Sequence, residues 1–405
     1  MTTPQTLKGF RDFLPQTMAI RSRVINILKG VFEKYGFSEL QTPTLEYAEV
    51  LTGKYGQEAE KLMYLFKDPG GRDIGLKYDL TVPLARVMGQ YPSLPKPFKR
   101  YQIQPAFRAE NTQKGRYREF YQCDVDTVGS TSPLTDAEIL AVISDSLTAL
   151  GFKDFKIRVN SRQILFSITK DLSVLQTIDK LDKKSVDEVK QELSQKGISV
   201  DEIQNIFTGL ESTQPDENLQ QVINLAQKLG AKNVQFDPRL VRGLDYYTGA
   251  IFETIVTEPK IGSITGGGRY DNLIKSLGGP DLPAVGTTLG LDRICDVIEE
   301  LNLWSNISPT STRVLVTIFS PELLDKSIEL STKLRKAGGG VELYPDDRTK
   351  LEKQLKYANV KGISFVAILG PEEAAKDTIK LKDMKTGEQK ELKIEELISY
   401  LEIKN

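Results

Sequence analysis

Apolar residues near the start of the chain follow a helical period. Between residues 19 and 35 they recur every three or four positions, and Gly36 follows as a stop signal. The apolar residues of this segment are Ile20, Val24, Ile27, Leu28, Val31 and Phe32. The pattern predicts an amphipathic helix. Pro43 then interrupts an extended segment, which suits a sheet edge or a subunit contact better than a central strand.

The next clear pattern is that of two strands. KRYQIQPAFR at 99–108 and EFYQCDVDTV at 119–128 have strand composition, and they enclose the ten-residue loop AENTQKGRYR. We expect a long hairpin with a basic tip. The segment ILAVISDSLTALG then predicts a helix capped at Gly151, and FKIRVN after it predicts a strand.

Changes in pattern divide the rest of the chain. Residues 170–228 are charged, Gln-rich and helical in period, which indicates a helical insertion between the two parts of a core, 1–169 and 229–302. A Ser/Thr/Pro cluster at 303–312 is typical of a linker. Residues 313–405 alternate strand and helix, and this order predicts a small α/β domain with a largely parallel sheet.

The composition is that of a globular protein. The 405 residues include 54 basic and 55 acidic groups and are 39% hydrophobic, which suits roughly two or three domains. A net charge of -1 means that any RNA contact must be regional. No segment approaches the roughly 18 apolar residues of a membrane span, and the N-terminal segment resembles no targeting peptide. We therefore expect a cytoplasmic protein without membrane spans.

The chain contains no histidine. This excludes Ser-His and Cys-His couples, HExxH zinc sites and a histidine general base. Cys123 and Cys295 are too distant for a CxxC unit and too few for a disulfide scaffold. Any chemistry must rest on carboxylates, arginine, lysine, tyrosine and backbone amides, which serve phosphate handling and electrostatic stabilisation.

The predicted hairpin carries the first candidate residues. Charged loops are common, so a solvated basic loop is one interpretation of its tip. On the second strand, Gln122 and Asp126 share a face, and their Cα atoms lie about 13 Å apart. They could hold both ends of a small polar ligand, although Asp126 alone can equally be an exposed carboxylate at a strand end. The basic residues of the hairpin are Arg108, Lys114, Arg116 and Arg118.

The segment LVRGLDYYTGAIFE at 240–253 carries a second set of candidates. It places Arg242 beside a glycine and two tyrosines in a strand-turn-strand context. Tyr246 and Tyr247 are equally consistent with core aromatics whose hydroxyl groups reach solvent. On their own, Tyr246 and Tyr247 do not indicate a function; their proximity to other candidate residues would.

Two glycine-containing segments follow. ITGGGRYDNL at 264–273 has three successive glycines before Arg269 and Tyr270, and glycine lets a backbone approach a ligand closely. It matches neither the P-loop nor the dinucleotide pattern, so it is a weak phosphate signal. AVGTTLGLDR at 284–293 predicts a strand followed by a helix with Arg293 in its first turn. The alternative for Arg293 is a surface ion pair.

In their order along the chain, these segments resemble the motifs of class II aminoacyl-tRNA synthetases, and specifically of the histidyl-tRNA synthetase family. FRAE with its basic loop resembles motif 2, AVGTTLGLDR resembles motif 3, and the first helix with the Pro43 strand resembles motif 1. LVRGLDYYTG and GGGRYD resemble two signatures peculiar to the histidine enzymes. The resemblance covers nearly the whole chain. It implies an α+β fold with an antiparallel sheet, flanking helices, a helical insertion and a C-terminal α/β anticodon-binding domain.

The resemblance also implies an ATP site. Arg108 would hold the α-phosphate, Glu110 would accept from the adenine amino group, and Arg293 would lie against the γ-phosphate. Arg116 belongs to the same site. Arg242 would stabilise the pentavalent α-phosphate and orient the attacking histidine carboxylate. A carboxylate nucleophile is already ionised at neutral pH and needs no general base, so the chemistry is compatible with the lack of imidazole.

A histidine pocket is implied in the same way. Asp79, Thr81 and Gln122 would receive the substrate ammonium group, while Asp126 and Tyr247 would hydrogen-bond the two imidazole nitrogens. The implied pocket residues are Asp79, Thr81, Gln122, Asp126, Arg242, Tyr246, Tyr247 and Tyr270.

The pocket differs from that of many bacterial members of the family. Asp79 and Asp126 stand where those members have glutamate, and Tyr121 stands where they have histidine. The shorter carboxylates match eukaryotic-type members, so we interpret them as a subgroup difference. The implied partners are histidine, ATP with Mg²⁺, the cognate tRNA and a second copy of the chain in a homodimer. The sequence does not assign metal ligands.

A second hypothesis comes from another class of protein. The regulatory subunit of ATP phosphoribosyltransferase resembles the same core but senses histidine without catalysis. Such a regulator need not keep Arg108, Arg242 and Arg293, nor the C-terminal domain. Those features favour the enzyme, and they also weaken a third possibility, a synthetase-like domain used only for protein interaction.

Overall fold

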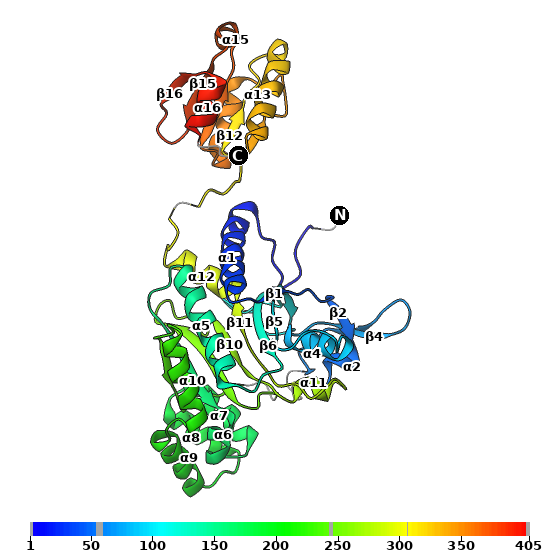
Figure 1. Cartoon of the computed structure of the whole chain (residues 1–405), viewed down its shortest axis with the longest axis vertical. Coiled ribbons are helices and arrows are strands. Elements are labelled where there is room, and N and C mark those ends of the chain that lie inside the picture. The colour runs from blue at the N-terminus through cyan, green and yellow to red at the C-terminus, as the bar shows by residue number, and fades with distance from the viewer. Residues whose placement is uncertain (1–2, 54–59, 243–245, 306, 402–405) are drawn as a thin grey trace. The chain divides into compact units, whose positions relative to one another are not determined.

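The computed structural model describes residues 3–53, 60–242, 246–305 and 307–401. The chain forms two compact units, one of Met1–Asp12 with Arg21–Trp304 and the other of Phe13–Ile20 with Ser305–Asn405 (Figure 1). Within the described ranges, no helix combines the length and the apolar character that a membrane crossing requires.

An eight-stranded sheet forms the centre of the first unit. Its inner pairings are all antiparallel, whereas the first and last pairings are parallel. The antiparallel sheet expected from the sequence is therefore confirmed. In spatial order the strands are β1 (Ser38–Glu39), β5 (Phe98–Phe107), β6 (Glu119–Val128), β11 (Ala284–Gly290), β10 (Thr265–Arg269), β9 (Ala250–Val256), β7 (Phe155–Ser161) and β8 (Val234–Phe236).

The first predicted helix and the predicted hairpin are both present. Helix α1 spans Pro15–Lys34 and begins before residue 19, because proline is well accepted in the first turn of a helix. It buries Val24, Leu28 and Phe32, as its apolar spacing predicts. The hairpin consists of β5 and β6, which pair along their whole length.

Helices flank this sheet. Helices α5 (Pro133–Ala149) and α12 (Leu291–Glu300) contact β6 and β11. Helix α4 (Thr81–Gln90) contacts α11 (Leu273–Ser276) and α2 (Ala48–Leu51). A separate three-stranded sheet has the order β2 (Leu45–Tyr47), β4 (Asp73–Leu76) and β3 (Leu65–Lys67).

Helices also fill the segment predicted as a helical insertion. Figure 1 shows α6, α7, α8 and α9 gathered together, with α10 leading back to the sheet. Ser185, Ser199 and Asp216 cap three of these helices through their side chains, as expected for polar residues at N-caps. The helices of the predicted segment are α7 (Leu172–Ile178), α8 (Val186–Gln195), α9 (Val200–Ser212) and α10 (Glu217–Lys228), and α6 (Arg162–Ile168) precedes it.

The second unit has a five-stranded sheet. Strand β12 is parallel to both of its neighbours, but the last two pairings are antiparallel, so the expected largely parallel sheet is wrong for that half. Only residues 369–378 separate β14 from β15, fewer than the dozen or so residues that a parallel crossover usually needs. The strands in spatial order are β13 (Val341–Leu343), β12 (Val314–Val316), β14 (Phe365–Ile368), β15 (Ile379–Asp383) and β16 (Gln389–Leu392).

Helices complete the second unit. Helix α13 connects β12 to β13 and α14 connects β13 to β14, so this half has the strand-helix alternation that the sequence predicts. The unit has an apolar core of its own between its sheet and its helices. The helices are α13 (Leu324–Lys336), α14 (Leu351–Lys361), α15 (Pro371–Lys376) and α16 (Ile394–Tyr400).

Candidate active site

One face of the large sheet is polar along its centre. Side chains alternate between the two faces of a strand, and the strand register aligns the polar positions in rows. One row consists of Arg100, Asp126, Gly286 and Gly268. The neighbouring row consists of Gln102, Asp124, Thr288, Gly266 and Glu253. The alternate positions on β6, Cys123 and Val125, belong to the opposite face and are fully buried.

Glycines make room on this polar face. An ideal Cβ at Gly286 would lie 1.9 Å from Oδ1 of Asp126, and one at Gly266 would lie 2.5 Å from a guanidinium nitrogen of Arg242. A Cβ at Gly268 would lie 2.8 Å from the ring of Tyr247. The GGG segment therefore lies within β10 and accommodates predicted site residues beside it.

The imidazole end of the predicted pocket surrounds Asp126. The Tyr270 hydroxyl donates a hydrogen bond to Oδ1 of Asp126, and a guanidinium nitrogen of Arg100 lies 2.8 Å from Oδ2. Burial raises the pKa of Asp126, while Arg100 and the hydrogen bond from Tyr270 oppose the rise. Burial also raises the pKa of Tyr247, which keeps its hydroxyl protonated at neutral pH. The ring of Tyr246 lies between the other two tyrosines, with centroids 4.9 Å from Tyr247 and 5.9 Å from Tyr270.

The ammonium end is built around Asp79. Its Oδ1 accepts hydrogen bonds from the backbone amides of Thr81, at 3.1 Å, and Val82, at 3.0 Å. The Tyr246 hydroxyl donates to the other oxygen at 3.4 Å, which links this end to the tyrosines. Gln122 donates to Oγ1 of Thr288 at 3.2 Å, whereas its own carbonyl oxygen is buried without a hydrogen bond from a described residue.

The predicted phosphate-binding residues gather at the loop of the hairpin. Arg108 follows β5 directly and donates to the carbonyl oxygen of Tyr78 at 3.2 Å. Its guanidinium carbon lies 4.2 Å from the ring centroid of Tyr78 and 5.1 Å from that of Phe120. Glu110 forms an ion pair with Arg116. Two residues predicted to bind ATP thus satisfy each other before any ligand arrives.

Arg293 connects motif 3 with the hairpin loop. It lies in the first turn of α12, and its Nε donates to the carbonyl oxygen of Gly115 at 2.9 Å. A second nitrogen donates to the carbonyl oxygen of Ser263 at 2.5 Å. Burial and the nearby Arg116 lower the pKa of Arg293. These contacts differ from the surface ion pair that was the alternative for this residue.

Arg242 lies beside the same face. A guanidinium nitrogen is 3.6 Å from Oε2 of Glu253, and its Nε is buried and donates no hydrogen bond to a described residue. The carboxylate of Glu253 raises the pKa of Arg242, although burial acts against it. The middle of the LVRGLDYYTG signature, residues 243–245, lies outside the described residues.

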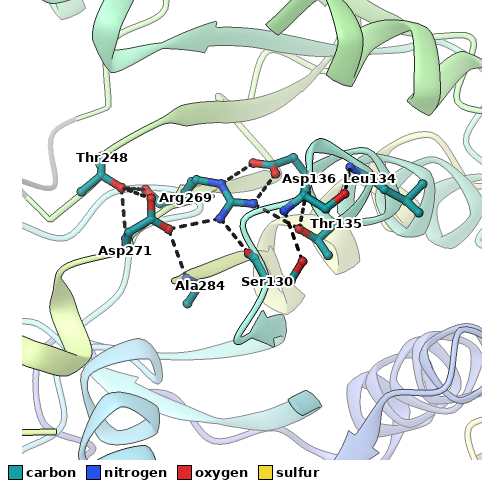
Figure 2. A network of polar contacts seen from close by, with 9 residues as sticks. Ser130, Leu134, Thr135, Asp136, Thr248, Arg269, Asp271 and Ala284 are labelled. Atoms are coloured by element: carbon teal, nitrogen blue, oxygen red, sulfur yellow. Dashed lines mark hydrogen bonds and ion pairs between the residues drawn. The ribbon is translucent and has the colours of Figure 1, made fainter. Parts of the chain in front are cut away.

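Arg269 is the centre of a polar network next to the pocket (Figure 2). Its Nε donates to Oδ1 of Asp136 at 3.1 Å, and another nitrogen contacts Oδ1 of Asp271 at 3.1 Å and the carbonyl oxygen of Ser130 at 3.0 Å. Thr248 donates from its backbone to the carbonyl oxygen of Arg269 at 2.8 Å and from its hydroxyl to Asp271 at 3.2 Å. The network joins α5, the end of β10 and the segment before β9.

This network has a direct consequence for the pocket. Tyr270 lies between Arg269 and Asp271 in sequence, and Tyr247 precedes Thr248. Because the neighbours of both tyrosines are held by the same buried arginine, the two rings are fixed relative to each other. The LVRGLDYYTG and GGGRYD signatures thus lie close together in the fold, although about twenty residues separate them in sequence. The sequence alone does not predict this proximity.

Sequence reasoning missed three residues of this face. Asp124 lies between Gln122 and Asp126, and the same period of two that paired those residues could have identified it. Arg100 and Glu253 gave no such signal, because their contacts depend on the register between strands that are distant in sequence.

Comparisons with known proteins agree with this arrangement. The family described as "Histidyl-tRNA synthetase" matches residues 9–294, and the "Anticodon binding domain" matches residues 313–404. A histidine–tRNA ligase of Gloeobacter violaceus is 40% identical, with 96% of each chain covered. The crystal structure of histidyl-tRNA synthetase from Nostoc sp. PCC 7120 has a TM-score of 0.85 and 30% identity, with 99% of each chain covered.

One similar structure bears on the second hypothesis. A Bacillus halodurans protein described as an ATP phosphoribosyltransferase regulatory subunit/histidyl-tRNA synthetase has a TM-score of 0.72 and 20% identity. The match covers 87% of this chain and 96% of that one. At this identity the similarity shows a shared fold alone.

The space at Gly286 can be tested by filling it. We expect Gly286→Ala to displace Asp126, to raise the KM for histidine at least about tenfold, and to destabilise the protein by about 1 to 3 kcal/mol through overpacking. Histidine-dependent ATP–pyrophosphate exchange and urea unfolding measure the two effects. Gly30→Ala is the control, since a Cβ at this position of α1 meets nothing within 4 Å. An unchanged histidine KM in Gly286→Ala would show that the position of Asp126 for histidine binding does not depend on the missing side chain at residue 286.

The Arg269 network predicts a large stability effect. Arg269→Met leaves Asp136 buried without its cation, and breaking a buried ion pair in this way costs about 3 to 5 kcal/mol. Urea unfolding followed by circular dichroism measures the loss. Lys275→Met, which removes an exposed pair with Asp281, should change the unfolding midpoint little. Equal shifts in both variants would contradict the anchoring role of Arg269.

Proposed function

The chain belongs to the histidyl-tRNA synthetase family, and from this membership we propose how its site residues act in the reaction. The protein is a histidine–tRNA ligase, a class II aminoacyl-tRNA synthetase that uses ATP to join histidine to tRNA. The observation that carries this function is the match to a histidine–tRNA ligase that is 40% identical, with 96% of this chain and 96% of the relative covered.

The first chemical step is the activation of histidine. A carboxylate oxygen of histidine attacks the α-phosphorus of ATP, a new P–O bond forms, and the bond to the β-phosphate breaks. Histidyl-adenylate and pyrophosphate result. The nucleophile is already ionised, so positioning and charge stabilisation replace a general base. Transfer follows when a ribose hydroxyl of the tRNA displaces AMP from the activated carbonyl.

Three arginines divide the work on the phosphates. Arg108 holds the α-phosphate, and Arg293 lies against the γ-phosphate. Arg242 stabilises the charge that develops on the α-phosphate and orients the histidine carboxylate. This role is supported by its buried Nε, which donates no hydrogen bond to a described residue. Glu110 accepts from the adenine amino group, after ATP has displaced its present partner Arg116.

The histidine substrate lies along the polar face. Asp79, with Thr81 and Gln122, receives the ammonium group, and the buried carbonyl oxygen of Gln122 supports this role because it has an open hydrogen-bond position. Asp126 and Tyr247 bind the two imidazole nitrogens. The remaining lining residues are Tyr246, Tyr270 and Arg242, which enclose the ligand.

We include Mg²⁺ with ATP in this proposal. No group of three or more potential metal-binding side chains exists among the described residues. Mg²⁺ commonly binds through substrate phosphates, water and one or two carboxylates, so such a group is not required. Glu253 is a carboxylate that contacts Arg242 at the proposed α-phosphate site, and it would hold the ion. When bound, the metal neutralises phosphate charge.

The finer features of the assembly are also proposals. We propose that the enzyme is a cytoplasmic homodimer, with the Pro43 segment in the subunit contact, and that residues 313–405 bind the anticodon of the tRNA. We also propose the division into a core of 1–169 and 229–302 with an insertion at 170–228. The helices between Leu172 and Lys228 are consistent with it.

The regulatory-subunit hypothesis is less well supported. All three phosphate-site arginines are present, and the C-terminal unit has its own core. A histidine sensor requires neither. The hypothesis makes a distinct prediction, because a sensor binds histidine without catalysing exchange.

The decisive experiment is ATP–pyrophosphate exchange by the purified chain. We expect exchange that depends on histidine, and we expect Arg242→Ala to lower its rate about 10² to 10³-fold, the usual cost of losing one preorganised donor. Arg239→Ala is a matched control, since Arg239 lies three residues away and is exposed. Near-normal exchange in Arg242→Ala would remove this residue from the mechanism. Histidine binding without exchange in the unmodified chain would favour the regulator.

A truncation separates activation from transfer. A chain that ends at Ser311 should retain pyrophosphate exchange, because the proposed adenylation residues all precede residue 300. Aminoacylation of tRNA should fall strongly, since the anticodon contacts are lost. Exchange, aminoacylation and the molar mass in solution are measured on the same preparation. If the truncated chain charges tRNA as well as the full chain does, the anticodon-binding assignment is wrong.

A further inference from the structure

Arg100 is a buried arginine with no role in the mechanism described so far. It lies on β5, its relative exposure is 0%, and the strand register places it directly opposite Asp126 on β6. A fully buried guanidinium is costly unless carboxylates and hydrogen bonds compensate for the loss of water. The groups that contact the Arg100 guanidinium therefore indicate its role.

Those partners belong to both ends of the histidine pocket. One guanidinium nitrogen lies 2.8 Å from Oδ2 of Asp126, and the same nitrogen donates to the carbonyl oxygen of Leu80 at 3.2 Å. Leu80 lies between Asp79 and Thr81, whose side chain and backbone form the proposed ammonium site. A single nitrogen thus connects the segment that receives the ammonium group with the carboxylate that receives the imidazole.

The other contacts fix the guanidinium itself. A second nitrogen donates to Oε1 of Gln102 at 3.3 Å. The nitrogen that contacts Asp126 also lies 3.9 Å from Oδ2 of Asp124, a second carboxylate. Tyr270 holds the remaining oxygen of Asp126. The carboxylate of Asp126 is therefore held from two sides, by a hydroxyl on one oxygen and by a cation on the other.

We propose that Arg100 is a positioning residue for histidine recognition, which orients the Asp126 carboxylate and keeps it at a fixed distance from the ammonium site around Asp79. The inference rests on the proposed function, because it requires Asp126 and Asp79 to bind opposite ends of the substrate. Arg100 itself does not contact histidine. By fixing the distance between Asp126 and the ammonium site, Arg100 sets the length of the pocket. That length determines which amino-acid side chain the pocket accepts.

The charge of Arg100 also affects the pH range of binding. Burial raises the pKa of Asp126 and raises that of Asp124 to about 8, and Arg100 lowers both. Without Arg100, Asp126 would remain protonated to a higher pH, where it cannot accept a hydrogen bond through the protonated oxygen. Histidine affinity would then fall at neutral pH and recover as the pH rises. The titratable and charged groups that act on these two carboxylates are Arg100, Lys77, Asp79 and Tyr270.

The test compares Arg100→Met with Arg100→Lys in the full-length enzyme. For Arg100→Met we expect the histidine KM in pyrophosphate exchange to rise about 10- to 100-fold at neutral pH, because the Asp126 carboxylate loses its ion-pair partner, with the ATP KM nearly unchanged. The pH profile of kcat/KM for histidine should move to higher pH. Arg100→Lys restores the charge without the planar fork, so its profile should return toward that of the unmodified enzyme, with an intermediate KM.

Two further variants separate positioning from folding. Arg158→Met removes another buried arginine of the same sheet, which pairs with Asp182 and Asp237, and should lower stability without changing the histidine KM. Arg100→Met combined with Asp124→Asn removes one charge of each sign. This double variant remains informative if Arg100→Met alone does not fold, and it should keep a high histidine KM.

The outcomes are distinct. Asp126→Asn is the reference, and it should raise the histidine KM without raising the ATP KM. An active enzyme in which Arg100→Met, or the double variant, keeps the normal histidine KM and pH profile would overturn the role of Arg100. Equal increases in the KM values of both substrates would also overturn it, since they indicate general damage. If Asp126→Asn binds histidine normally, the pocket assignment itself is wrong. Absence of exchange in the unmodified chain would instead contradict the proposed function.

Discussion

The alternation of side chains along the central antiparallel strands is the constraint on which the rest of the structure depends. One face of β6 carries Gln122, Asp124 and Asp126, while the alternate residues are apolar and lie on the opposite face. A slip of one residue would bury the wrong set on both faces. The same register aligns Asp126 with Arg100 on one neighbouring strand and with Gly286 on the other. Arg100 compensates the charge of the Asp126 carboxylate, and the missing side chain of Gly286 leaves room for it.

Charges on this face are paired before substrates arrive. Glu110 pairs with Arg116, and Glu253 lies near Arg242. A substrate that displaces such a partner exchanges one charged contact for another, so it need not desolvate an isolated ion. Two buried atoms have no hydrogen-bond partner among the described residues. The Nε of Arg242 can donate to the substrate carboxylate, and the carbonyl oxygen of Gln122 can accept from the substrate ammonium group.

Much of this arrangement could be predicted from the sequence. The helix near the N-terminus, the long hairpin and the strand-to-helix step before Arg293 follow from local periodicity and glycine stops, and the structure confirms them. Contacts between distant strands could not be predicted in this way. The pairing of Arg100 with Asp126 depends on register, and the antiparallel half of the C-terminal sheet depends on short connections that local pattern does not resolve. The roles of individual site residues stay predictions.

The lack of histidine in the chain connects the composition to the chemistry. Imidazole serves enzymes chiefly as a base near neutral pH, but the first step here begins from an ionised carboxylate and releases pyrophosphate, so neither end of the step needs such a base. What this step requires is fixed positive charge, and arginine remains charged even when buried. The pocket must also distinguish imidazole from other rings, and carboxylate and hydroxyl groups can do so by accepting from one nitrogen and donating to the other. An enzyme that handles imidazole as a substrate can therefore bind and activate it without a histidine of its own.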